Sequence, residues 1–206
     1  MNNICCIFAG SPEIGLPCLP IPDDAFYLCA DSGLRLAQSL GITPHMVLGD
    51  FDSLDSFPEH LPHITAPVEK DDTDTMLAVR YALEHQYRDI RIFGAFGGRL
   101  DHTFANIQTL RFLSSHGAAG VLVGTNDYAY LHTGGTLSFR KLDGFSFSVF
   151  ALTDSAEDIT LTGTKYPLSH APLHADFPLG VSNQITGESA EVSCGSGLLL
   201  IIGSRL

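Results

Sequence analysis

The feature that most constrains the fold is a change in the hydrophobic pattern near residue 126. Up to about residue 125, short apolar runs alternate with segments of helical spacing, such as Thr73–His85. After about residue 130 the apolar runs are short, rich in Phe, Val, Ile, Leu and Thr, and separated by turn residues. The first pattern is typical of a mainly parallel sheet covered by helices, and the second of a small antiparallel sandwich or barrel.

These patterns predict individual elements. In the first part we expect strands at Asn3–Ala9, Ala25–Ala30, His45–Gly49, Ile90–Ala95 and Val121–Gly124, and helices at Leu34–Leu40, Thr73–His85 and Thr103–His116. In the second part we expect only strands, at Thr136–Arg140, Phe145–Leu152, Asp158–Thr162, Ser182–Thr186, Glu191–Cys194 and Leu198–Ile202. The predicted fold is an α/β N-terminal domain (1–128) and an all-β C-terminal sandwich domain (129–206), with the boundary between about 126 and 135.

Composition excludes several classes of protein. Of the 206 residues 45% are hydrophobic, enough for a buried core, and the formal net charge of −12 comes from 23 acidic and 11 basic residues. Nucleic-acid backbones and anionic membranes need a basic patch, so we expect neither as a partner. No apolar run approaches the ~20 residues of a membrane span, and Met1–Phe8 lacks the basic start of a signal peptide.

The five cysteines point to a reducing compartment. They are an odd number and include no CxxC pair or zinc spacing, so they make a poor disulfide or metal framework. We interpret them as small buried side chains of a cytoplasmic protein.

The acidic residues are unevenly chosen and placed. The chain has 16 Asp and 7 Glu. Seven aspartates follow a predicted strand or precede a predicted helix: Asp31, Asp50, Asp52, Asp71, Asp72, Asp74 and Asp101. In a parallel sheet the residues after the strands converge on one edge, where ligands bind. Carboxylates gathered there repel one another unless a cation binds, and their chemistry suits Mg²⁺.

Each of the three acidic segments also has a structural interpretation. Asp50 and Asp52 form an Asp-x-Asp pair that suits one ion, or an ordinary loop pair. The segment 70–74 provides a helix cap through Asp72 or Thr73, although three aspartates exceed what a cap needs. The segment 97–102 is a Gly-rich turn entering a helix, which either binds phosphate through free N–H groups and Arg99 or simply joins a strand to a helix.

Several catalytic motifs are absent. The sequence contains no GxGxxG and no GxxxxGK[ST], so a bound nucleotide would depend on carboxylate-held metal and scattered donors. It also contains no GxSxG and no HExxH, which leaves nucleophilic catalysis without support.

In combination and in order, the segments resemble the thiamine pyrophosphokinase family. The matching stretches are Ala30–Gly33, Pro44–Ser53, Lys70–Asp74, Gly97–His102 with Asn106, and Gly180–Asn183 followed by Gly187–Glu188 and the terminal apolar strand. The resemblance implies an ATP-binding N-terminal domain and a thiamine-binding C-terminal β-sandwich. It also implies transfer of a pyrophosphoryl group from ATP to the thiamine hydroxyl, giving thiamine diphosphate and AMP, with Mg²⁺ as cofactor. The implied assembly is a homodimer with thiamine between the two subunits.

The resemblance assigns roles to residues of this chain. It implies Asp50, Asp52 and Asp74 as metal ligands, and Asp31, Asp72, Thr73, Gly98, His102 and Asn106 as residues that bind the nucleotide. Arg99 stabilises charge on the transferring group, and either Asp71 or Asp101 accepts the hydroxyl proton. Ser182 and Asn183 contact thiamine. Some family members place a Trp against thiamine, and this chain has none.

Three other functions stay open at this point. A related diphosphokinase acting on another alcohol, such as a hydroxymethylpterin, would share the N-terminal site and differ in the C-terminal pocket. A phosphatase of the haloacid dehalogenase type would use Asp50 as nucleophile, but it prefers Thr or Val where Leu54 stands. A non-catalytic sensing module would be expected to lose the carboxylates, which are all present.

Overall fold

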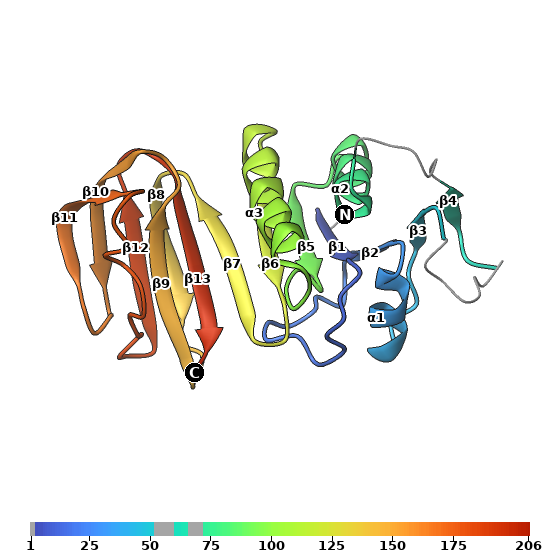
Figure 1. Cartoon of the computed structure of the whole chain (residues 1–206), viewed down its shortest axis with the longest axis horizontal. Helices are drawn as coiled ribbons and strands as arrows, with labels where there is room; N and C mark the ends of the chain where they lie inside the picture. Colours follow the sequence, from blue (N-terminus) through green and yellow to red (C-terminus); the bar gives the residue numbers. More distant parts are fainter. Residues whose placement is uncertain (1–2, 52–59, 66–71) are drawn as a thin grey trace. The chain divides into compact units, whose positions relative to one another are not determined.

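The computed structural model describes residues 3–51, 60–65 and 72–206 of the chain (Figure 1). Two of the predicted site residues, Asp52 and Asp71, lie outside the described residues. The chain divides into two compact units, Met1–Asn126 and Asp127–Leu206. None of the helices in the described part combines the length and the apolar character needed to cross a bilayer.

Unit 1 is built from parallel strands and three helices. Its strands are β1 (Ile4–Phe8), β2 (Phe26–Ala30), β3 (Met46–Gly49), β4 (His63–Thr65), β5 (Asp89–Phe93) and β6 (Ala119–Val123). Its helices are α1 (Gly33–Ser39), α2 (Asp74–Glu84) and α3 (Leu100–Ser115). All five strand pairings are parallel, in the order β4-β3-β2-β1-β5-β6.

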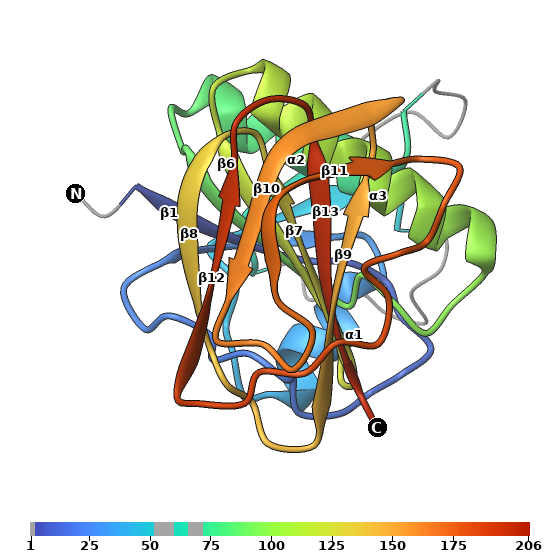
Figure 2. The same ribbon diagram turned by 90° about the vertical axis from the view of Figure 1, so that its left-hand side faces the viewer.

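Helices cover both faces of this sheet. α2 packs on β1, β2 and β3 and touches α3, which packs on β6, while α1 lies on the opposite face (Figures 1 and 2). The central strands β1 and β5 are almost fully buried, with Cys5, Ile7, Ile90 and Ile92 at 0% exposure. Burial on both faces explains why β1 is a continuous apolar run, whereas β5 carries the half-buried Asp89 and Arg91 among its buried residues.

Unit 2 is a sandwich of two antiparallel sheets. One sheet has the order β7-β13-β9, formed by Asp127–His132, Leu199–Arg205 and Phe145–Ala151. The other has the order β11-β10-β12-β8, formed by Leu168–His174, Ser155–Thr162, Ser189–Cys194 and Gly135–Arg140. Figure 2 shows the second sheet lying over the first.

One apolar core joins the two sheets of unit 2. The ring of Phe139 from one sheet packs at a tilt against that of Phe147 from the other, with the ring centroids 5.3 Å apart, and Ile159 and Val192 of the same core are fully buried. Buried and exposed residues alternate along β12, as expected for a strand with one face on the core and the other exposed to solvent.

The fold class predicted from the sequence is confirmed, and most predicted elements occur within a few residues of their expected bounds. Three strands were not predicted, β4, β7 and β11. The predicted helix Thr103–His116 begins three residues early, at Leu100.

One predicted strand, Ser182–Thr186, is wrong. Ser182 has a φ of +57°, in the left-handed region, which interrupts an extended backbone at this position. The segment forms only isolated bridges, from Asn183 to Phe147 and from Ile185 to Thr164.

Candidate active site

The order of the parallel strands places a crevice between β1 and β5. From β1 the chain builds outward through β2, β3 and β4, and then returns to the other side of β1 to form β5 and β6. In sheets of this kind ligands bind beyond the carboxyl ends of the strands where the order reverses. A cavity of about 270 Å³ lies at this point, lined by Ala9 and Gly10 after β1 and by Gly94, Ala95 and Phe96 after β5.

Two helix starts complete the cavity. Thr73 and Thr75 line it from the start of α2, and Gly98, Arg99, His102 and Asn106 line it from the start of α3. Of the residues expected to bind ATP, the structure therefore brings together Thr73, Gly98, His102 and Asn106, with Arg99 beside them. Asp31, Asp50, Asp72, Asp74 and Asp101 are not among the lining residues.

The turn before α3 keeps backbone donors available. Within the described part of the chain, the N–H groups of Gly97, Gly98, Arg99 and Leu100 donate no hydrogen bond to another atom of the protein. Gly97 has a φ of +87°, in the region that favours glycine. Free N–H groups and the positive end of the helix dipole attract phosphate, and Arg99 adds a cation.

Arg99 forms an ion pair with Asp101. The guanidinium donates through Nε to Oδ1 at 3.1 Å and through a terminal nitrogen to Oδ2, and the backbone N–H of His102 donates to the same Oδ1 at 2.9 Å. The hydrogen bond from Arg99 holds the pKa of the Asp101 carboxyl below its usual range. A carboxylate with a lowered pKa is a weaker proton acceptor than an unpaired aspartate.

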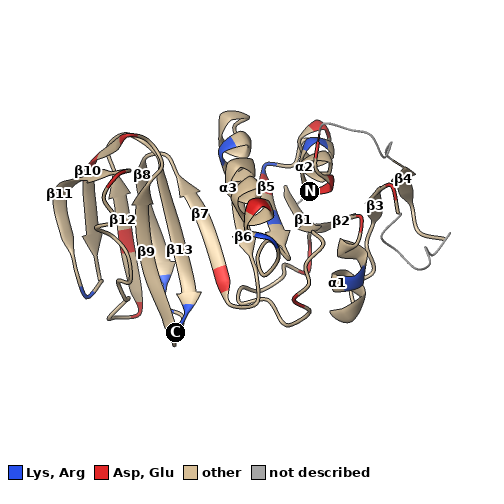
Figure 3. Cartoon of the chain, in the orientation of Figure 1, with Lys and Arg blue, Asp and Glu red and all other residues tan. Residues whose placement is uncertain are grey.

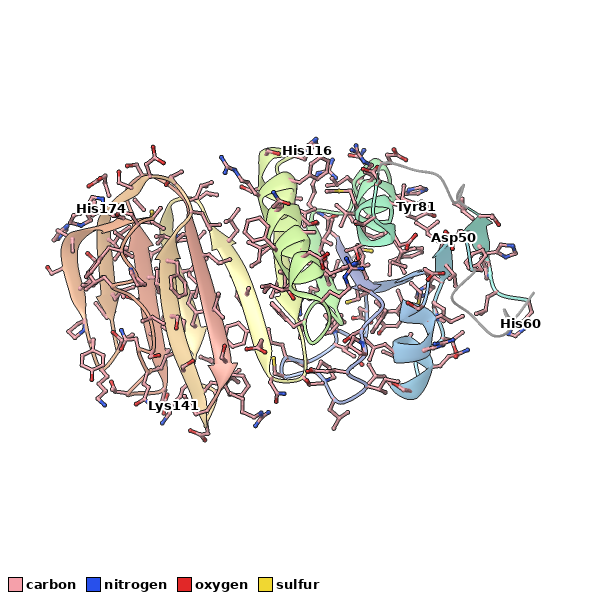
Figure 4. All side chains as sticks on the ribbon, viewed as in Figure 1. Asp50, His60, Tyr81, His116, Lys141 and His174 are labelled. Carbon is pink, nitrogen blue, oxygen red and sulfur yellow. The ribbon has the colours of Figure 1, made fainter. Side chains whose placement is uncertain are left out.

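Asp31 lies against the end of β3. It is 6% exposed, its N–H donates to the carbonyl of Leu48 at 2.6 Å, and a Cβ added to Gly49 would lie 3.1 Å from its Oδ1. Asp50 follows Gly49 directly (Figure 4). The end of β2 thus places Asp31 beside Gly49, the residue that precedes Asp50.

The start of α2 combines a cap with an ion pair. Thr73 is the N-cap, since its Oγ1 accepts from the N–H of Met76 at 3.2 Å. Asp72 accepts from Nε of Arg80 at 2.7 Å. Asp74 stands in the first turn of α2, as Asp101 does in α3 (Figure 3). In the described residues no three His, Cys, Asp or Glu side chains gather closely enough to hold a metal by themselves.

In unit 2 the side chain of Asn183 is committed to the fold. Asn183 is 3% exposed. Its Oδ1 accepts from the N–H groups of Tyr166 at 3.0 Å and Gln184 at 2.9 Å, and its Nδ2 donates to the carbonyl of Tyr166 at 2.7 Å. This side chain ties two turns together instead of pointing to solvent.

The neighbouring residue differs. The side chain of Ser182 is exposed, while its N–H donates to Oγ of Ser148 at 3.0 Å. Three large apolar side chains precede it in exposed positions, Phe177 (63%), Leu179 (54%) and Val181 (50%). Phe177 also borders a second cavity of about 300 Å³, together with His174 and Asp176.

Three buried cysteines of unit 1 are unsuited to nucleophilic catalysis. Burial raises the pKa of Cys6 and of Cys29 to about 12, and raises that of Cys5 further. A thiol with such a pKa supplies almost no thiolate at neutral pH.

Sequence reasoning missed part of the cavity wall. Gly10 and Pro12 belong to the turn after the first strand, and Phe96 belongs to the turn after β5. The Gly10-Ser11-Pro12 turn at the carboxyl end of a predicted parallel strand was the signal that could have identified the first of these.

Comparison with known proteins agrees with this geometry. Residues 21–120 match the family model described as thiamin pyrophosphokinase, catalytic domain, and residues 136–199 match the one described as thiamin pyrophosphokinase, vitamin B1 binding domain. A thiamine pyrophosphokinase of Bacillus subtilis is 30% identical, covering 96% of this chain and 97% of the relative.

Solved structures of similar proteins extend the match to the whole fold. The crystal structure of a thiamine pyrophosphokinase from Bacillus subtilis superposes with a TM-score of 0.89 at 28% identity, covering 98% of this chain and 99% of the other. One from Geobacillus thermodenitrificans gives 0.85 at 31% identity, covering 98% of each chain. The chain belongs to the thiamine pyrophosphokinase family.

Proposed function

We propose that this protein is a thiamine pyrophosphokinase, which transfers the pyrophosphoryl group of ATP to the hydroxyl of thiamine and releases AMP. The observation that carries the proposal is the cavity at the β1–β5 switch point, whose wall includes Gly98, Arg99 and the start of α3. Residues 1–128 would bind ATP and residues 129–206 would bind thiamine. The vitamin B1 binding family model favours thiamine over a hydroxymethylpterin as the acceptor.

The residues of the cavity suit a triphosphate. The unused N–H groups of Gly97, Gly98 and Arg99 would donate to phosphate oxygens, and the Arg99 guanidinium would offset charge on the transferring group. Thr73, His102 and Asn106 would hold the nucleotide in place. Since little covalent chemistry falls to the protein in phosphoryl transfer, positioning of the thiamine hydroxyl in line with the β-phosphorus is its main task.

The carboxylates suit Mg²⁺ bound jointly with ATP. Mg²⁺ commonly takes one or two carboxylates and completes its shell with water and phosphate oxygens, so a protein cage of three acids is not required. Asp50, Asp52 and Asp74 would provide these ligands, and the nearness of Asp31 to the Gly49–Asp50 peptide supports a carboxylate site at this edge. Bound Mg²⁺ would neutralise phosphate charge. Asp71 would accept the hydroxyl proton.

Thiamine would contact unit 2 at the exposed Ser182, with apolar surface from side chains such as Val181 in place of the missing Trp. We also propose a homodimer with thiamine at the subunit interface, and a cytoplasmic location. The exposed Phe177, Leu179 and Val181 support an interface on this unit.

The function is tested by incubating the purified protein with thiamine, ATP and Mg²⁺ and separating the products by chromatography. Thiamine diphosphate and AMP in equal amounts are the expected products. Thiamine monophosphate with ADP, or hydrolysis of ATP alone, would contradict the proposal.

The metal assignment is tested with Asp50→Asn and Asp74→Asn. Each substitution should lower kcat/KM by at least about 100-fold, because it removes an anionic ligand from the site. The circular dichroism and urea-unfolding curves should be unchanged. Asp89→Asn in β5, which loses a half-buried pair with Arg91 at 3.3 Å, is the matched control. Near-normal turnover in both test variants would refute the assignment.

A further inference from the structure

The loop after β1 holds the loop after β5 through Ser11. Ser11 Oγ donates to the carbonyl of Phe96 at 2.9 Å, across 85 positions of sequence. The same Oγ accepts from the N–H of Glu13 at 3.1 Å, which fixes the direction of the hydroxyl. Because a trans peptide carries its C=O and the next N–H on opposite sides, the bond to Phe96 also fixes the direction of the Gly97 N–H.

Glu13 packs against Gly97 of the loop after β5. Oγ1 of Thr125 donates to Oε2 of Glu13 at 2.6 Å. A Cβ added to Gly97 would lie 2.3 Å from Cδ of Glu13, so the Glu13 side chain lies directly on the glycine. Glu13 therefore connects the end of β6 with the turn that precedes α3.

A third side chain holds the loop from the other direction. Nδ2 of Asn106, on α3, donates to the carbonyl of Ala95 at 2.9 Å. Two consecutive carbonyls, those of Ala95 and Phe96, are thus held by side chains from two separate segments. Asn106 lines the cavity, whereas Ser11 and Glu13 do not, so the latter two act on the loop and not on its ligand.

We infer that Ser11 and Glu13 are positioning residues for nucleotide binding, which hold the loop 95–98 so that the donors of Gly97, Gly98 and Arg99 face the phosphates of ATP. The inference rests on the proposed function. Donors that are oriented before the ligand arrives need not be ordered during binding, so the loss of either support weakens the affinity for ATP. Thiamine, which we place on unit 2, is not affected.

The role of Glu13 lies in its hydrogen bond and its packing, not in its charge. A carboxylate near a phosphate site repels the ligand. Glu13→Gln keeps a carbonyl oxygen that accepts from Thr125 and keeps the same side-chain length over Gly97. The KM of this variant for ATP should therefore be no higher than that of the wild type, whereas Glu13→Ala should raise it.

The test is a steady-state kinetic comparison in which ATP and thiamine are varied separately. Ser11→Ala and Glu13→Ala should each raise the KM for ATP about fivefold, the effect of one lost hydrogen bond, while the KM for thiamine stays unchanged and the urea midpoint falls no further than in a control variant that loses a similar bond. Ser39→Ala is the matched control, since it removes another hydroxyl-to-carbonyl bond in unit 1, from Ser39 to Leu36 at 2.7 Å in α1. It should change neither KM.

The outcomes separate this inference from the proposed function. A wild-type protein that makes thiamine diphosphate, with variants whose ATP KM is unchanged, overturns the positioning role alone. A fall in kcat with both KM values unchanged, or Glu13→Gln behaving like Glu13→Ala, also overturns it. A wild-type protein that binds no ATP overturns both.

Discussion

The two units use their polar groups in opposite ways. In unit 1 the functional loops leave backbone donors unused, at Gly97, Gly98 and Arg99, beside a cavity of about 270 Å³. In unit 2 the polar residue Asn183, from the segment Gly180–Asn183 that resembles the family, is buried. Its side-chain oxygen and nitrogen are already hydrogen-bonded within the protein. Unit 2 instead exposes apolar side chains, such as Phe177 and Val181.

The difference follows from what each unit would bind. A polyanion is held by donors and charge, which must be left unsatisfied in the free protein. An organic ring is held by shape and apolar surface, and the polar residues around it are free to stabilise the fold. Substitutions of polar residues in the loops of unit 1 should therefore change ATP binding, whereas those of buried polar residues in unit 2 should change stability.

The sharpest test of this contrast is Asn183→Ala. The change removes the acceptor of the Tyr166 and Gln184 N–H groups, whereas the carbonyl of Tyr166 keeps the Thr164 hydroxyl as a donor at 3.2 Å. Buried polar groups left in this way cost ~1–3 kcal/mol each, and partial access of water reduces the sum, so we expect a loss of about 3 kcal/mol in the free energy of unfolding. Urea unfolding followed by circular dichroism measures it.

Ser182→Ala is the matched partner of that variant. Within the part of the chain that the structure describes, its exposed hydroxyl makes no hydrogen bond to the protein. The urea midpoint should therefore stay that of the wild type, while the KM for thiamine rises and the KM for ATP does not. The proposed difference between the units would be wrong if Asn183→Ala kept the urea midpoint of the wild type and strongly raised the KM for thiamine. Asn183 would then bind thiamine instead of stabilising the fold.

A smaller effect is expected from Asp101 and Arg99 in unit 1. Both side chains are exposed, at 61% and 76%, so neither should contribute measurably to stability. Asp101→Asn loosens the guanidinium and should raise the KM for ATP about fivefold. Arg99→Gln should raise it by a similar factor and should also lower kcat, because the guanidinium would offset charge on the transferring group.

The double variant distinguishes orientation from catalysis. If Asp101 acts through Arg99, combining Asp101→Asn with Arg99→Gln should raise the ATP KM no further than Arg99→Gln alone. A loss of 100-fold or more in kcat for Asp101→Asn alone, with Arg99 intact, would instead show that Asp101 is the base.

The parts of the fold that sequence predicts well are those with a strong local pattern. The buried runs of β1 and β5 and the spacing of α2 are such patterns, and the cap at Thr73 was one of two residues expected for it. β4 has only three residues, all exposed, and so carries no hydrophobic signal. β11 contains Pro172, which in the sequence argues against a strand. The strand forms nevertheless because it lies at the edge of its sheet, where proline is tolerated.

The site was predictable in its residue types and less so in its geometry. The convergence of Thr73, Gly98 and Asn106 followed from the rule that ligands bind beyond parallel strands. The pairs of Asp72 with Arg80 and of Asp101 with Arg99 depend on rotamers that no spacing rule specifies. The burial of Asn183 depends on Tyr166, 17 positions away, which no local pattern connects to it.

The smallest predicted effect is a pH dependence of unit 2 that arises at His132. His132 is 4% exposed in β7, and its Nε2 lies 3.1 Å from the carbonyl oxygen of Gly135, to which it donates. Burial lowers the pKa of the imidazole, and the hydrogen bond to Gly135 opposes this in part. The unfolded chain therefore takes up a proton at a higher pH than the folded chain does. Stability should fall as the pH drops below the ordinary histidine pKa of about 6.5.

Urea midpoints at pH 7 and pH 5 measure this change, and His132→Gln isolates it. The glutamine amide can donate to Gly135 and does not titrate, so the variant should lose less stability between the two pH values than the wild type. His174→Gln, at an exposed position at the end of β11 (Figure 4), should keep the wild-type difference. If His132→Gln kept it too, the titration of His132 would have no part in the stability of unit 2. The view that its buried polar groups serve the fold would then rest on Asn183 alone.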